Sequence, residues 1–90
     1  MLDNHLIGEI MEEDILGFVT GNNNRQKLLA LLGSKGGMDA ARIAKTMRIV
    51  RPSVNRILDE LVERELITKE GEVYSLSDLG VQVEKKIHSL

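Results

Sequence analysis

The chain has 90 residues, of which 42% are hydrophobic and 29% are charged, and its formal net charge is -2. This length suits one domain with a modest core, and the composition is that of an ordinary soluble domain. The absence of cysteine excludes disulfides, thiolate metal sites and a cysteine nucleophile. The acidic N-terminus and short apolar runs indicate neither a secretory signal nor a membrane span, so we expect a cytoplasmic protein.

The first segment combines apolar residues at helical spacing with acidic residues and no lysine or arginine. Its apolar positions are Leu2, Leu6, Ile7, Ile10 and Met11. This spacing predicts an amphipathic helix capped by Asp3, within an N-terminal helical extension over residues 1–20. His5 lies one turn from Glu9, but one histidine with two carboxylates is a weak ligand set, so we predict no metal.

Residues 24–90 are predicted to form the main domain. The run TGNNN, which ends at Asn24, predicts a loop and a helix cap. The leucines of RQKLLALLG predict a buried helix that ends at Gly33. Asp39 is expected to cap a short helix. The inner face of that short helix consists of Ala40, Ile43, Ala44 and Met47.

A second helix follows after a connection of about four residues, the spacing of a helix-turn-helix. Pro52 suits the first turn of this helix, which we place at about residues 51–64. Its predicted buried positions are Val54, Ile57, Leu58, Leu61 and Val62. The pattern then changes to alternation around Gly71, which predicts a hairpin, and Ser77 begins a final helix. The apolar stripe of the final helix is Leu79, Val83, Ile87 and Leu90.

The stretches RIAKTMRIVRPSVNRILDELVERELI, ITKEGEVYSL and LSDLG, in this order, resemble the winged helix-turn-helix transcriptional regulators of the broad MarR/ArsR-like kind. The resemblance covers about residues 24–90. It implies a mainly α fold with a small β-hairpin wing: a winged helix-turn-helix with an extra N-terminal helix and a C-terminal helix. Three features depart from the usual pattern. No small polar residue precedes Arg51 as a helix cap, Glu65 stands where a glycine is common, and the wing tip Glu70-Gly71-Glu72 is acidic.

Positive charge is concentrated in the helix-turn-helix. Residues 40–58 contain five basic residues and no acidic one. A recognition helix reads bases with its N-terminal turns, so Ser53, Asn55 and Arg56 are the candidates for base contacts in double-stranded DNA. The candidates for backbone contacts are Arg42, Lys45, Arg48, Arg51 and, on the wing, Lys69. A simpler interpretation pairs Arg56 with Asp59 or Glu60 as an ordinary surface contact.

No catalytic constellation, phosphate loop or cofactor motif is present in the sequence, so we predict neither an enzyme nor a cofactor. The leading hypothesis is a sequence-specific DNA-binding transcriptional regulator that acts as a homodimer through its N-terminal or C-terminal helix, although either apolar stripe can instead close the monomer core. The alternative is a winged-helix module that docks a protein partner in a macromolecular assembly, which the acidic wing and N-terminal segment favour. The chain offers little room for an effector pocket, so no small-molecule ligand is predicted.

Overall fold

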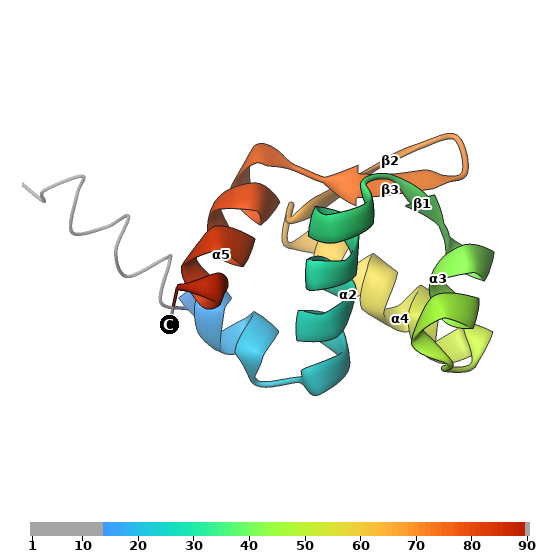
Figure 1. The fold of residues 1–90 in the computed structure, drawn as a ribbon, viewed down its shortest axis with the longest axis horizontal. Coiled ribbons are helices and arrows are strands. Elements are labelled where there is room, and N and C mark those ends of the chain that lie inside the picture. The colour runs from blue at the N-terminus through green and yellow to red at the C-terminus, as the bar shows by residue number, and fades with distance from the viewer. Residues whose placement is uncertain (1–13, 90) are drawn as a thin grey trace, which may run out of the picture.

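The computed structural model describes residues 14–89 (Figure 1). Residues 14–20 are helical, and the elements that follow are α2 (Asn23–Lys35), β1 (Met38–Asp39), α3 (Ala40–Met47), α4 (Arg51–Glu63), β2 (Ile67–Glu70), β3 (Val73–Leu76) and α5 (Asp78–His88). This order confirms the mainly α winged helix-turn-helix with a hairpin wing and a C-terminal helix. The helix expected from Asp3 and the end of the final stripe at Leu90 lie outside the described residues.

Three helices begin at the polar caps that the sequence provides. The Asn22 side chain accepts a hydrogen bond from the backbone N–H of Arg25 at 3.0 Å. In the same way Asp39 caps α3 and Ser77 caps α5, at 2.8 Å and 2.9 Å from the N–H groups they satisfy. Each cap pairs a donor that the helix itself leaves without a partner.

Two details of the helices differ from expectation. Helix α2 does not end at Gly33 but continues to Lys35, and it ends at Gly36, which has a left-handed φ of 80°. Burial of the leucines of α2 outweighs the cost of about 1 kcal/mol for a glycine within a helix. Val62 was expected in the core but is 40% exposed, because it lies about 100° around α4 from Leu61 and falls at the edge of the apolar stripe.

The sheet has one strand more than the predicted hairpin. It is antiparallel with the order β1-β3-β2, and β1 pairs with β3 through Met38 opposite Tyr74 and Asp39 opposite Val73. A strand of two residues has no periodicity for sequence analysis to detect. By joining β3 to the residues just before α3, this strand ties the wing to the helix-turn-helix.

One hydrophobic core joins all the described elements. Its buried residues are Val19, Leu28, Leu29, Leu32, Met38, Ala40, Ile43, Val54, Ile57, Leu58, Leu61, Leu66, Ile67 and Val83. Val19 brings helical residues 14–20 into this core, and Val83 does so for α5, with Leu79 and Ile87 half-buried beside it. The described part of the C-terminal stripe therefore packs within the monomer.

A compact junction fixes the wing between α4 and α5. The hydroxyl of Ser77 donates to the carbonyl oxygen of Glu65 at 2.6 Å, and its N–H donates to that of Leu66 at 3.0 Å. Gly80 approaches the same carbonyl so closely that a Cβ at this position would lie 2.0 Å from the oxygen. This junction sets the position of the hairpin relative to α4.

Candidate nucleic-acid interface

The turn between α3 and α4 is built from an arginine in an unusual conformation. Arg48 ends α3 with φ 59° and ψ 42°, in the left-handed region, and its N–H donates to the carbonyl of Ala44. The N–H of Ile49 donates to the same carbonyl at 3.2 Å. A residue with a Cβ adopts this conformation at a cost of about 1 to 2 kcal/mol relative to a right-handed one. The turn is therefore sharp, and it displays a charged side chain where glycine would be less strained.

Helix α4 begins at Val50 without a capping hydrogen bond from its side chain. Pro52 occupies the first turn, where its lack of an N–H costs nothing. Val50 is 68% exposed, so its side chain neither caps the helix nor fills the core. The start of α4 is thus less stabilised than the starts of the three capped helices.

Five basic side chains surround this turn. Arg42, Lys45, Arg48, Arg51 and Arg56 are all exposed. Within residues 14–89, none of these side chains forms an ion pair or hydrogen bond. Three of them, from Arg42 to Arg48, line an open hollow on the outer side of α3. The end of the molecule formed by α3 and the start of α4 (Figure 1) thus carries unneutralised positive charge.

The three candidate base-reading residues lie on the first two turns of α4. Val54 is completely buried, and it anchors this part of the helix to the core. Asn55 and Arg56 are exposed, whereas Ser53 is half-buried. Ser53 and Arg56 line one polar hollow together with residues from the start of α2 and with Glu60. The expected surface pair between Arg56 and Asp59 or Glu60 does not form in the described structure.

Lys69 lies apart from the other basic candidates, on strand β2 of the wing. It is exposed, it stands opposite Tyr74 in the sheet, and its Nζ lies 5.5 Å from the centre of the Tyr74 ring. The hairpin then turns at Gly71, whose φ is 60°, between the exposed carboxylates of Glu70 and Glu72. The tip of the wing is therefore acidic, and the ammonium group of Lys69 lies over the aromatic ring of Tyr74.

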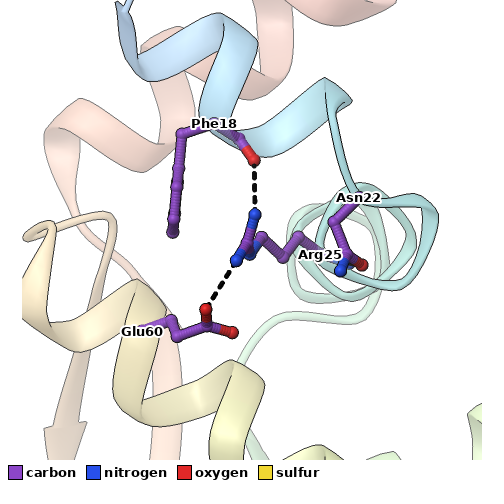
Figure 2. Close-up of polar contacts among 4 residues, drawn as sticks. All are labelled: Phe18, Asn22, Arg25 and Glu60. Atoms are coloured by element: carbon purple, nitrogen blue, oxygen red, sulfur yellow. Dashed lines mark hydrogen bonds and ion pairs between the residues drawn. The ribbon is translucent and has the colours of Figure 1, made fainter.

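A cluster around Arg25 joins three segments and was not foreseen from the sequence (Figure 2). Arg25 Nη1 donates to the carbonyl oxygen of Phe18 at 3.1 Å, and Nη2 pairs with Glu60 Oε2 at 2.5 Å. Its guanidinium carbon lies 4.1 Å from the centre of the Phe18 ring. Arg64, from the end of α4, lies 4.3 Å from the same centre and pairs with Asp14 at 3.3 Å. No spacing rule relates Arg25 to Glu60, because 35 residues separate them.

The described residues contain no other candidate centre. Across residues 14–89, no group of three His, Cys, Asp or Glu side chains is placed to hold a metal ion. His88 lies near the end of α5 beside Glu84, at 3.5 Å. In this same range, no helix combines the length and apolarity that a membrane crossing requires. The alternative metal set at His5 and Glu9 lies outside the described residues.

Comparison with known proteins matches residues 13–90 to the family model described as the HVO_A0261 N-terminal domain. The chain is also 34% identical over 64 residues to the HTH-type transcriptional activator ArnR of Sulfolobus acidocaldarius, a match that covers 70% of this chain and 24% of ArnR. The chain thus spans about a quarter of the length of this relative.

Two solved structures share the fold at low sequence identity. Quinone-bound YodB from B. subtilis gives a TM-score of 0.76 at 16% identity, covering 86% of this chain and 87% of YodB. Reduced MarR from E. coli gives a TM-score of 0.75 at 16% identity, covering 96% of this chain and 67% of MarR. These similarities agree with the winged helix-turn-helix fold expected from the sequence.

Proposed function

The chain belongs to the family of the HVO_A0261 N-terminal domain, and from this premise we propose that it is a sequence-specific, double-stranded DNA-binding transcriptional regulator. Its similarity to an HTH-type transcriptional activator supports the regulatory part of this proposal. The fold supports the DNA-binding part, because a helix-turn-helix presents its second helix to the major groove. Double-stranded DNA is favoured over RNA, whose A-form major groove is too narrow for a helix.

Helix α4 is the recognition helix in this proposal. Its first turns carry Ser53, Asn55 and Arg56 toward the bases. Arginine matches the O6 and N7 acceptors of guanine, and asparagine matches the N6 and N7 atoms of adenine. Each such two-bond contact is worth about 1 to 3 kcal/mol of discrimination against the wrong base. Ser53 is half-buried, so we assign it a shorter reach than its two neighbours.

The remaining basic residues contact phosphates in this proposal. Arg42 and Lys45 project from α3, Arg48 from the turn, and Arg51 from the start of α4. Contacts of this kind fix register and supply affinity without reading sequence. Lys69 is assigned a backbone contact from the wing, although the acidic tip beside it opposes a close approach to phosphates.

One observation carries the proposal: Arg48 is exposed and unpaired in a left-handed conformation. A glycine here would remove the Cβ strain, so the fold gains nothing from arginine at this position. Strained backbone of this kind is found preferentially at functional sites. A charge kept at such a cost, among four other unpaired basic residues, fits a contact with the phosphate backbone.

The test compares two glycine substitutions at matched backbone positions. Arg48→Gly and Glu65→Gly each replace a residue with φ near 60° (59° and 61°), and only the first lies at the proposed interface. Both substitutions should raise the free energy of unfolding by about 1 kcal/mol relative to the wild type. Only Arg48→Gly should lose affinity for duplex DNA, measured by fluorescence anisotropy at about 50 mM salt. Equal affinities for the two variants would contradict the role of Arg48, and absence of duplex binding by the wild type would overturn the whole function.

We also propose that the protein acts as a homodimer, through residues 1–20, α5 or both. A two-fold dimer doubles the number of phosphate contacts and matches half-sites about 34 Å apart. Leu79, Val83 and Ile87 of α5 pack within the monomer, and so does Val19, so the proposal favours residues 1–13 as the seam. Sedimentation equilibrium at tens of micromolar protein should give the dimer mass, and a deletion of residues 1–13 should shift it toward the monomer. A wild-type monomer at this concentration would refute the dimer.

A protein-docking module is the second candidate, and the acidic wing tip favours it. Glu70 and Glu72 repel phosphates but suit a basic protein surface. Salt separates the two candidates, because DNA affinity falls steeply with salt in proportion to the number of phosphates contacted. Failure to bind duplex DNA at micromolar protein in about 50 mM salt would favour docking.

A further inference from the structure

Arg25 lies at the start of α2, which packs against the proposed recognition helix α4, and its guanidinium group makes three contacts. It donates to the backbone of Phe18, stacks on the ring of the same residue and pairs with Glu60 on α4 (Figure 2). The side chain of Arg25 is 21% exposed and that of Glu60 is 31% exposed. Only Nη2 contacts the carboxylate, so the fixed guanidinium group restrains Glu60 through one charge-assisted hydrogen bond.

The carboxylate that Arg25 holds has a second potential partner. Glu60 follows Arg56 by four residues on α4, so the two side chains share one face of the helix. Both also line the polar hollow between α2 and α4. A Glu60 carboxylate without Arg25 would therefore lie within reach of Arg56 and would add negative charge beside the proposed DNA contact. In the described structure Arg56 is instead exposed and has no ionic partner.

We propose that Arg25 is a positioning residue for DNA recognition: it binds Glu60 and so keeps Arg56 available to the DNA. This inference rests on the proposed function, because it assumes that Arg56 contacts DNA. It adds a residue outside the helix-turn-helix to the determinants of affinity. Arg25 acts through two side chains and touches no base itself.

The proposed role and a purely structural role predict opposite effects on DNA affinity when the charge of Glu60 is removed. If the Arg25–Glu60 pair only stabilised the fold, loss of either partner would weaken DNA binding in the same way. If Arg25 restrains Glu60, loss of Arg25 is harmful and loss of the Glu60 charge is not. Removal of the carboxylate even reduces repulsion from the phosphates.

The experiment measures affinity for a selected duplex by anisotropy with Arg25→Gln, Glu60→Gln and the double variant. Circular dichroism establishes that each variant is folded at the assay temperature. Arg25→Gln should weaken binding about two- to fivefold, the size of one exposed ion pair. Glu60→Gln and the double variant should bind at least as tightly as the wild type. If the double variant regains wild-type affinity, the loss in Arg25→Gln comes from the released Glu60 and not from a loss of folding.

Two further variants complete the design. Arg64→Gln removes the other guanidinium stacked on Phe18, at the far end of α4, and should leave affinity unchanged. In an Arg56→Ala background, Arg25→Gln should cause no additional loss, because its target is already absent. Equal weakening by Arg25→Gln and Glu60→Gln, or an undiminished loss in the Arg56→Ala background, would overturn the positioning role. Failure of the wild type to bind any duplex would overturn the proposed function itself.

Discussion

The junction that holds the wing makes a strong prediction for Gly80. In Gly80→Ala the new Cβ would lie 2.0 Å from the carbonyl oxygen of Leu66 and 3.1 Å from its carbonyl carbon. The neighbour is backbone, so no side-chain rotation relieves the overlap. Helix α5 or the start of β2 must move by about 1 Å or more, in a region packed at close to crystal density. The same oxygen accepts the hydrogen bond from the N–H of Ser77, which this movement weakens.

The expected cost follows from these contacts. Overpacking of this kind costs about 1 to 3 kcal/mol, and a weakened hydrogen bond adds up to about 1 kcal/mol. The higher helix propensity of alanine offsets at most about 1 kcal/mol of this loss of stability. We therefore expect Gly80→Ala to lower the free energy of unfolding by about 2 kcal/mol. For a domain of this size, that lowers the Tm by roughly 8 to 16 °C.

Urea unfolding followed by far-ultraviolet circular dichroism measures this difference. Gly17→Ala is the matched control, because it lies in helical residues 14–20 and its Cβ would meet nothing within 4 Å. It should be neutral or stabilise the protein by up to about 1 kcal/mol. If Gly80→Ala were as stable as Gly17→Ala, the close approach between α5 and Leu66 would be refuted as a constraint on the wing.

Three other substitutions test the local structure. Val50→Thr keeps the branched shape and adds a hydroxyl that caps α4, so it should raise the free energy of unfolding by about 0.5 to 1 kcal/mol, whereas Val50→Ala should not. Asp39→Ala removes the cap of α3 and should cost about 1 kcal/mol by thermal unfolding, while Asp39→Asn should retain most of the stability. Phe18→Leu retains an apolar side chain but removes the ring on which two guanidinium groups stack at 4.1 Å and 4.3 Å. It should cost about 1 to 2 kcal/mol, and a loss below 0.5 kcal/mol would argue against these stacking contacts.

The sequence predicted those parts of the fold that depend on local patterns. The caps at Asp39 and Ser77, the turn at Gly71 and the apolar stripe of α4 except Val62 lie where the spacing placed them. Errors occurred where long-range packing decides. Burial of neighbouring leucines carries α2 through Gly33, and strand β1 exists only because β3 lies beside it.

The sequence identified the candidate basic residues, but it did not predict the side-chain contacts around them. The basic run and the helix-turn-helix spacing identified Arg48, Arg51 and Arg56 as a group, and the structure exposes all three. The sequence offered Glu60 as a neighbour for Arg56 on the same helix. The actual partner of Glu60 is Arg25, from a helix far along the chain, and only the tertiary structure brings these two side chains together.

Unfavourable local choices concentrate at the turn between α3 and α4. Asn22, Asp39 and Ser77 cap their helices, whereas Val50 leaves α4 uncapped. Arg48 keeps a Cβ in the left-handed region. Elsewhere, arginines of the described segment are paired or stacked, but those around the turn are not.

Natural sequences satisfy most local rules, and functional sites are where exceptions are expected. Glu65 is the exception outside this region, since it also has a positive φ. Its carbonyl oxygen accepts a hydrogen bond from the hydroxyl of Ser77 at the wing junction. That backbone conformation therefore serves the junction, and it does not require a glutamate side chain. The backbone of Arg48 likewise serves its turn, through the hydrogen bond to Ala44, and its exposed, unpaired side chain within residues 14–89 fits the phosphate contact that we propose for it.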